Sequence, residues 1–372
     1  MTAAATLERA RRVVVKVGSA LLVDAAGEPR LPWLQSLAED VSVWHCRGAQ
    51  IIIVTSGSIA LGRRILGLPG RVLKLEEKQA AAAAGQIRLA RAYQECLGEV
   101  GLRTAQILVT LSDTEARRRY LNARATMETL IRLGVVPVVN ENDTVATSEI
   151  RYGDNDRLSA RVAVMNSAEL LILLSDVDGL YAADPRIDRT ARHLPEVPSI
   201  NAEIEAMAGG SGSAHGTGGM VSKLAAAKIA TSAGCAVILG DGKSLRPLHA
   251  LDDGARCTYF GAATTPRGAR KHWIAASLGV MGSIRIDDGA KAALKRGSSL
   301  LPAGVVAISG QFERGDAILI EDQSGVGIAK GLSAYDAVDA VAIAGRRSQE
   351  IESILGFRGR DAMIHRDDLV LL

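Results

Sequence analysis

The chain has 372 residues, of which 48% are hydrophobic, and a formal net charge of +3. This length allows two domains of roughly 100–200 residues each, and so small a net charge gives no reason to expect a nucleic-acid-binding protein. The apolar runs are far shorter than the about 20 residues that a membrane-spanning helix needs, so we expect a soluble protein.

The N-terminus resembles a secretion signal only superficially, because Glu8 lies in the would-be basic region and Lys16 divides the apolar segment. We therefore expect a cytoplasmic protein. The six histidines form no HExxH pattern and the four cysteines form no CxxC pair, so we predict no metal site built by the protein. The cysteines, expected to be reduced, are Cys46, Cys96, Cys235 and Cys257.

The first 260 residues alternate between two kinds of segment. Short β-branched runs, each ending in small or polar residues, occupy 13–19, 51–57, 107–110, 135–143, 170–176 and 236–242. Helical patterns lie between them, for example at 34–47, 78–97, 116–133 and 158–166. Strands that are apolar on both faces and alternate with helices predict an α/β fold with a mostly parallel sheet sandwiched by helices. Ligands of such sheets bind beyond the carboxyl ends of the strands.

The pattern changes after residues 257–275, where short strands with frequent turns replace the alternation. We place a domain boundary near residue 276, and we expect a small β-rich module to follow it.

A glycine-rich stretch, GSAHGTGGMVSKLAAAKIA at 212–230, leads into an alanine-rich helix. It is not a dinucleotide fingerprint, because GxGxxG starting at Gly216 would need glycine at Val221. The nearby segment VILGDGKS is not a P-loop, because Val237 stands five positions before Gly242, where that motif requires glycine. The stretch could hold an anion through backbone N–H groups and the helix N-terminus, with Lys223 in the first turn. A surface loop followed by a helix with solvated lysines is the alternative.

Two further segments carry candidate groups at strand ends. Lys16 lies within the apolar run VVVKVG, where a buried charge would need an anionic partner. The alternative is an edge strand with Lys16 in water. The segment TSGS offers Ser56 and backbone donors, although an ordinary helix N-cap would explain it equally well.

The segment 140–160 is dense in acidic residues, namely Glu141, Asp143, Glu149, Asp154 and Asp156. Each could serve only a turn or a helix cap. Together with the two lysines and the glycines, they suit phosphoryl transfer to an anionic acceptor, which relies on positioning and charge neutralisation. A carboxylate acceptor, with a pKa of about 4.3, would need no general base. Asp156 would orient the lysines, and Asp143 would suit a substrate ammonium group.

Several motifs in combination resemble the glutamate 5-kinase family, whose members have the amino acid kinase fold and a C-terminal PUA domain. They are VVKVGS (14–19), IVTSGSIALG (53–62), KQAAAAAGQ (78–86), YLNARATM (120–127), VPVVNENDTV (136–145), GDNDRLSA (153–160), LLSDVDGLYAADPR (173–186) and GTGGMVSKLAAA (216–227). The resemblance implies a kinase domain at 1–265, a linker at 266–281, a β-rich PUA domain at 282–360 and a C-terminal tail at 361–372.

The resemblance also implies ATP-dependent phosphorylation of the γ-carboxylate of L-glutamate, the first step of proline biosynthesis. Lys16 and Lys223 would contact the phosphates, and Asp156 would hold these lysines. Glutamate would be bound by Ser56, Asp143 and Asn155. The nucleotide site would comprise Lys16, Ser175, Asp176, Thr217, Gly218, Gly219, Met220, Val221, Ser222 and Lys223. Magnesium would be carried on the ATP phosphates, with no metal site of the protein's own.

By the same analogy we expect a homo-oligomer, a dimer or a tetramer, inhibited by proline and followed by a glutamyl phosphate reductase. Two other functions are considered: RNA binding through the C-terminal module, and amino acid sensing without catalysis. Lys16, Asp156 and Lys223 argue against a sensor. Residues 275–372 contain 11 Lys and Arg against 13 Asp and Glu and carry few aromatic residues, so we do not expect RNA binding.

Overall fold

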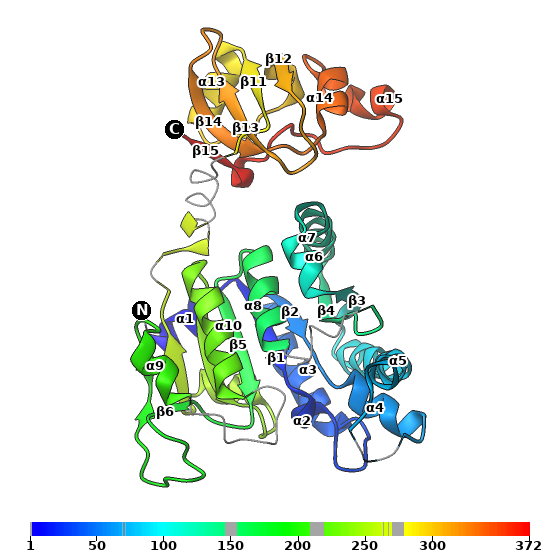
Figure 1. Ribbon diagram of the computed structural model, residues 1–372, viewed down its shortest axis with the longest axis vertical. Coiled ribbons are helices and arrows are strands. Elements are labelled where there is room, and N and C mark those ends of the chain that lie inside the picture. The colour runs from blue at the N-terminus through cyan, green and yellow to red at the C-terminus, as the bar shows by residue number, and fades with distance from the viewer. Residues whose placement is uncertain are drawn as a thin grey trace. The chain divides into compact units, whose positions relative to one another are not determined.

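The computed structural model describes residues 2–68, 70, 72–145, 155–208, 219–262, 264–266, 268–269 and 279–372. The chain divides into two compact units, residues 1–266 and 267–372, each with its own sheet (Figure 1). Within this described part of the chain, no helix combines the length and the apolar character needed to cross a membrane.

The first unit is built on an eight-stranded sheet. Its strands, in spatial order, are β3 (Arg103–Val109), β4 (Val135–Glu141), β2 (Gln50–Val54), β1 (Arg12–Val17), β5 (Leu170–Ser175), β9 (Ala236–Asp241), β10 (Cys257–Phe260) and β8 (Glu196–Val197). The first six run parallel, and β10 pairs antiparallel with β9. The predicted mostly parallel sheet is confirmed.

Helices cover both faces of this sheet because alternate side chains of its central strands point to opposite faces. In β1, Val13, Val15 and Val17 pack in one apolar cluster and Val14 packs in the other. The first cluster includes side chains of α3 (Leu31–Cys46) and α5 (Leu75–Glu99). The second includes side chains of α7 (Arg117–Arg132), α8 (Asn155–Met165) and α10 (Met220–Ser232). Figure 1 shows α8 and α10 side by side over the sheet.

Strand β3 is longer than the apolar run 107–110 predicted, since it begins at Arg103. It lies at the edge of the sheet and its side chains are largely accessible, so polar residues are tolerated in its first half. A prediction that relied on continuous hydrophobicity could find only its buried end.

Helices α4 (Ser58–Ile65) and α5 pack with their backbones almost in contact. A Cβ added at Gly85 would lie 1.8 Å from the carbonyl oxygen of Ser58, and one at Gly62 would lie 1.7 Å from that of Ala81. Only glycine fits at either position. This close packing holds the start of α4 at the end of β2.

Shorter elements complete the first unit. They are α1 (Ala3–Arg9), α2 (Ser19–Leu22), α6 (Leu111–Glu115), the hairpin of β6 (Leu180–Tyr181) and β7 (His193–Leu194), α9 (Ala202–Met207) and α11 (Pro247–Asp252). The buried carboxylate of Asp40 on α3 accepts hydrogen bonds from Leu248 N and His249 N, at 2.8 and 3.2 Å. It thereby supplies acceptors to the first turn of α11.

The second unit contains a five-stranded sheet in the order β12 (Val305–Gly310), β11 (Gly282–Ile286), β13 (Ala317–Glu321), β14 (Gly327–Leu332) and β15 (Leu369–Leu371). The α-helices among the described residues of this unit are α13 (Asp288–Lys295), α14 (Ala337–Ile343) and α15 (Ile351–Leu355), and short 3-10 helices lie at Pro302–Gly304, Ser348–Glu350 and Arg366–Asp368. Ile284, Ile318 and Ile364 belong to its separate apolar core. Residues 361–372, expected as a tail, carry β15, which pairs with β14.

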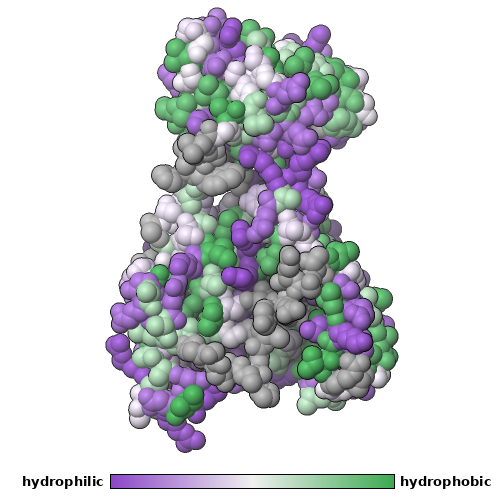
Figure 2. All heavy atoms as spheres, viewed as in Figure 1, coloured by the Kyte–Doolittle hydropathy of each residue, from purple (hydrophilic) through white to green (hydrophobic). Residues whose placement is uncertain are grey.

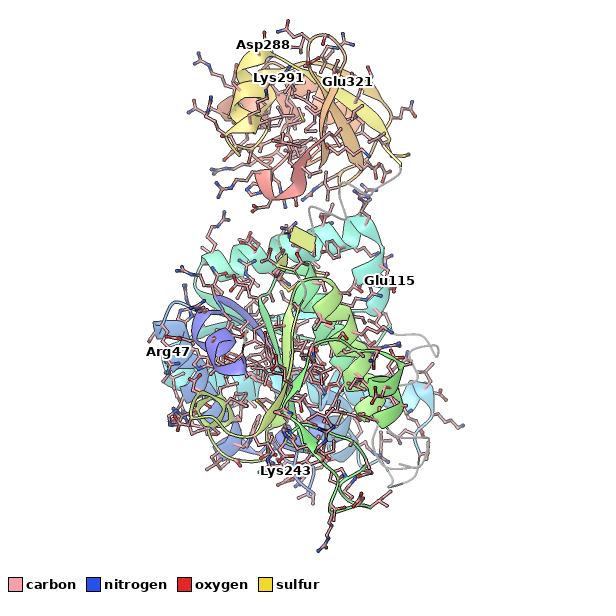
Figure 3. All side chains as sticks on the ribbon, turned by 90° about the vertical axis from the view of Figure 1, so that its left-hand side faces the viewer. Arg47, Glu115, Lys243, Asp288, Lys291 and Glu321 are labelled. Atoms are coloured by element: carbon pink, nitrogen blue, oxygen red, sulfur yellow. The ribbon has the colours of Figure 1, made fainter. Side chains whose placement is uncertain are left out.

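The surface of the second unit is chemically mixed. Figure 2 shows hydrophilic and hydrophobic side chains interspersed over its visible face. Lys291 and Asp288 project from α13 (Figure 3), and Lys291 Nζ lies 2.7 Å from Asp322 Oδ2. This lysine is therefore partly neutralised within its own unit.

Candidate active site

The candidate groups gather where the parallel strands β2, β1, β5 and β4 end. Lys16, near the end of β1, is in register with Val54 of β2 and with Leu173 of β5. Ser56, which follows β2, and Ser175, the last residue of β5, therefore lie at the same edge of the sheet. The backbone N–H of Thr55 donates to Val139 O at 2.9 Å, which brings the end of β4 to this place as well.

Lys16, Asp156 and Lys223 form a buried triad of charges. Lys16 Nζ lies 2.5 Å from Asp156 Oδ1, and Lys223 Nζ lies 3.2 Å from Asp156 Oδ2. The three residues expose only 7%, 0% and 7% of their surface. Because β1 is the fourth of eight strands, Lys16 is not on an edge strand, and that alternative is excluded.

The electrostatics of the triad depend on Asp156. Burial disfavours its ionised form and would raise its pKa, but the charges and hydrogen bonds of Lys16 and Lys223 outweigh burial and hold the pKa below its ordinary value of 3.8. Its position in the first turn of α8 also favours a negative charge. Two ammonium groups and one carboxylate leave a net charge of +1, which suits an anionic ligand.

Lys223 occupies the first turn of α10, where the helix dipole disfavours a cation. The carboxylate of Asp156 compensates for this position. Gly219 is the N-cap of α10, and a Cβ added there would meet nothing within 4 Å. Packing of the described protein therefore does not require glycine here, and the backbone can be approached from outside.

The remaining residues expected around the nucleotide lie in different environments. Met220 and Ser222 are partly buried, whereas Val221 is 63% exposed. Ser175 is buried at the end of β5, and its Oγ donates to Oδ1 of the exposed Asp176 at 3.1 Å. Thr217 and Gly218 lie outside the described residues.

The residues expected to bind glutamate meet at the end of β2. Ser56 is half-buried, and its carbonyl oxygen accepts a hydrogen bond from Thr55 Oγ1 at 3.2 Å. Asp143 accepts a hydrogen bond from Ser58 Oγ at 3.2 Å. Burial raises the pKa of Asp143, and the bond from Ser58 opposes that shift. Asn155 is 4% exposed and donates through Nδ2 to the carbonyl oxygen of Thr55.

The candidate list from the sequence omitted several residues around this group, and three of them link it to neighbouring elements. Ser58 bonds Asp143, Asn140 bonds Asn155, and Gln86 bonds Asn140. All three belong to motifs that the sequence shows, SGS, NEND and AGQ. Their pairing could not be read from the motifs because it joins residues far apart in the chain.

Comparisons with known proteins agree over nearly the whole chain. Residues 11–241 match the model of the amino acid kinase family, and residues 282–355 match that of the PUA domain. A glutamate 5-kinase of Paramagnetospirillum magneticum is 58% identical over 366 residues, 98% of this chain and 99% of that protein. A glutamate 5-kinase of Rhizobium rhizogenes is 56% identical, covering 100% of this chain and 95% of its own.

Among solved structures, carbamate kinase from Giardia lamblia covers 68% of this chain and 99% of its own, at 16% identity and a TM-score of 0.48. Membership of the family is shown by the family model, which matches more than half of the chain, and by the relatives, which match nearly all of it. The chain therefore belongs to the amino acid kinase family and, within it, groups with the glutamate 5-kinases.

Proposed function

We propose that this protein transfers the γ-phosphoryl group of ATP to the γ-carboxylate of L-glutamate, the first step of proline biosynthesis. A carboxylate oxygen forms a bond to the γ-phosphorus, and the bond from that phosphorus to the bridging oxygen breaks. The products are L-glutamyl 5-phosphate and ADP. The observation that carries the proposal is the buried Lys16–Asp156–Lys223 triad at the strand ends, in a chain whose relatives are glutamate 5-kinases over their full length.

The two lysines would stabilise the charge on the phosphoryl group during transfer. Such a reaction depends on positioning and on electrostatic stabilisation, and preorganised charges act most strongly where water is excluded. The acceptor carboxylate is already ionised at neutral pH, so no residue has to remove a proton from it. Asp156 is engaged by both lysines, which suits a group that positions and does not accept a proton.

ATP would lie along the ends of β1 and β5 and at the N-terminus of α10. The N–H groups of that first turn and Lys223 would face the phosphates. Lys16, Ser175, Asp176 and residues 217–223 would line the site. We expect magnesium to be bound by the phosphates of ATP and not by Asp156, because each carboxylate oxygen of Asp156 already pairs with a lysine.

Glutamate would lie at the end of β2, between the triad and Asp143. The carboxylate of Asp143 would accept hydrogen bonds from the α-ammonium group, and Ser56 and Asn155 would supply further polar contacts. A cation at this place would stabilise ionised Asp143 against the effect of its burial.

The test is an acyl phosphate assay. The full chain is incubated with ATP, magnesium and a candidate acid, and the product is trapped with hydroxylamine. We expect hydroxamate from L-glutamate. Hydroxamate from aspartate or N-acetylglutamate, with none from glutamate, would contradict the proposal.

Three further expectations follow from the family and from the chemistry. The acyl phosphate is labile, so a glutamyl phosphate reductase is the expected next enzyme, with channelling between the two. Proline is the expected feedback inhibitor. We expect a homo-oligomer, a dimer or a tetramer, in the cytoplasm. Sedimentation measurements test the oligomeric state, and activity assays with added proline test the feedback inhibition. Neither test depends on the assignment of the site residues.

A further inference from the structure

A series of hydrogen-bonded side-chain amides, which we call the amide relay, runs from α5 to the start of α8. Its members are Gln86, Asn140 and Asn155. Asn140 Nδ2, at the end of β4, donates to Gln86 Oε1 of α5 at 2.7 Å. Asn155 Nδ2 donates to Asn140 Oδ1 at 2.8 Å and also to the carbonyl oxygen of Thr55. Asn140 and Asn155 are 2% and 4% exposed, and Gln86 is half-buried.

The Thr55 carbonyl fixes the direction of this relay. A carbonyl oxygen can only accept, so the atom of Asn155 that faces it must be Nδ2. The second hydrogen of that nitrogen then requires an acceptor, which fixes Asn140 Oδ1 toward Asn155 and Asn140 Nδ2 toward Gln86. Gln86 Oε1 accepts the last of these hydrogen bonds and so helps to stabilise Asn140 in this orientation.

The relay leaves one polar atom unsatisfied. Asn155 Oδ1 is buried and has no hydrogen-bond partner among the described residues. An unsatisfied buried acceptor is costly, so it marks a place where a donor is expected to bind. Asn155 lies next to Asp156 of the triad and bonds Thr55, three residues before the Ser58 that holds Asp143. The free acceptor therefore belongs to the region assigned to glutamate.

We propose that Gln86 and Asn140 are positioning residues that act with the Thr55 carbonyl to hold Asn155 so that its Oδ1 accepts a hydrogen bond from the α-ammonium group of the substrate. This inference rests on the proposed function. An acceptor fixed in this way favours an ammonium group and disfavours a carboxylate, because two acceptors repel. Asn155 and Asp143 together then select an α-amino acid over the same diacid without nitrogen.

The experiment removes the end of the relay while leaving every group assigned to substrate contact in place. Gln86→Met keeps a similar length and helix propensity but cannot accept from Asn140 as an amide oxygen does. Gln86→Glu keeps the acceptor. Gln94→Met makes the same change at an exposed position of the same helix and serves as the control. Each full-length variant is assayed for the KM of L-glutamate, the KM of ATP, kcat, and the inhibition constant of glutarate, which lacks the ammonium group.

We expect Gln86→Met to raise the KM of glutamate about fivefold, the effect of one weakened hydrogen bond. The KM of ATP, kcat and the glutarate constant should each change less than about twofold, because none of them involves the ammonium group. Gln86→Glu and Gln94→Met should behave like the wild type. The Kd of glutamate, measured by calorimetry without ATP, should follow the KM.

Equal changes for glutamate and glutarate would show a general structural effect and would overturn the inference. So would an unchanged KM of glutamate in Gln86→Met. Absence of glutamyl phosphate formation by the wild type would instead contradict the proposed function, so the two failures are distinguishable.

Discussion

At the scale of single residues, the charges of the site depend on one another. Neither lysine would be stable in its buried position without Asp156, and Asp156 would not remain ionised there without the lysines. The sequence suggested these three residues separately, each with a structural alternative. The strand order removes the alternative for Lys16, because β1 is a central strand.

Substitution of either lysine should reduce turnover. We expect Lys16→Ala and Lys223→Ala each to lower kcat by at least about 100-fold, because each removes a preorganised cation worth about 3 kcal/mol to the transition state. Lys228→Ala is the control on α10, where an exposed lysine pairs with Glu205 at 2.5 Å and contributes little. Near-normal kcat in folded Lys223→Ala protein would show that this lysine is only structural.

Asp156 should also contribute pH-dependent stability. Its folded pKa is lower than 3.8, so its stabilising effect is complete at neutral pH and is lost as the pH falls below 3.8 through the folded value. Asp156→Asn leaves the lysines without their counterion and should cost about 3–5 kcal/mol at pH 7. Urea unfolding of both proteins from pH 7 to pH 3 should show this difference shrinking at the acid end. A difference that stays constant over this range would argue against an ionised Asp156.

At the scale of the elements, packing decides which motifs meet. The glycines of α4 and α5 allow two helix backbones to approach until no Cβ fits between them. That approach places Ser58, the first residue of α4, beside Asp143, and it places Gln86 of α5 beside Asn140. The alanine-rich helix α5 thus supports the part of the candidate site that we assign to glutamate.

A single methyl group should disturb this pair of helices. Gly85→Ala should destabilise the fold by about 1–3 kcal/mol or more, since the new Cβ would lie 1.8 Å from Ser58 O. Gly98→Ala, on the same helix with nothing within 4 Å, should be neutral or stabilising by up to about 1 kcal/mol. Thermal unfolding of the two variants measures the contrast, and equal stabilities would refute the close contact.

At the scale of the whole molecule, the two units have separate cores and the candidate site belongs to the first. The apolar cluster of residues 284–369 shares no member with the clusters of the first unit. Residues 275–372 of the second unit carry 11 Lys and Arg against 13 Asp and Glu, and the face shown in Figure 2 mixes polar and apolar side chains. A role in assembly or regulation fits these features better than binding to phosphates.

Truncation should therefore separate chemistry from the second unit. We expect residues 1–274 to retain glutamate kinase activity in the hydroxamate assay, because every candidate site residue lies within them. We expect the isolated second unit to bind RNA only weakly at physiological salt. A folded truncation without activity, or sub-micromolar RNA binding that resists salt, would contradict this division of roles.

The sequence by itself determined the fold class, and it supplied the candidate residues of the site. It could do so because hydrophobic period and strand-end polarity are local properties of the chain. It also carried the motifs that indicate the kinase family. It missed the first half of β3, whose polar edge residues give no apolar run.

Only the tertiary structure decided which of the candidate groups touch. Lys16 is 140 residues from Asp156 in the chain, and Gln86 is 54 residues from Asn140, yet both pairs are in contact. The order of the strands, β2 beside β1 and β1 beside β5, brings their ends together, and sequence order does not reveal it. The direction of each amide in the relay likewise follows from its neighbours in space, because a hydrogen bond depends on distance and orientation and a sequence specifies neither.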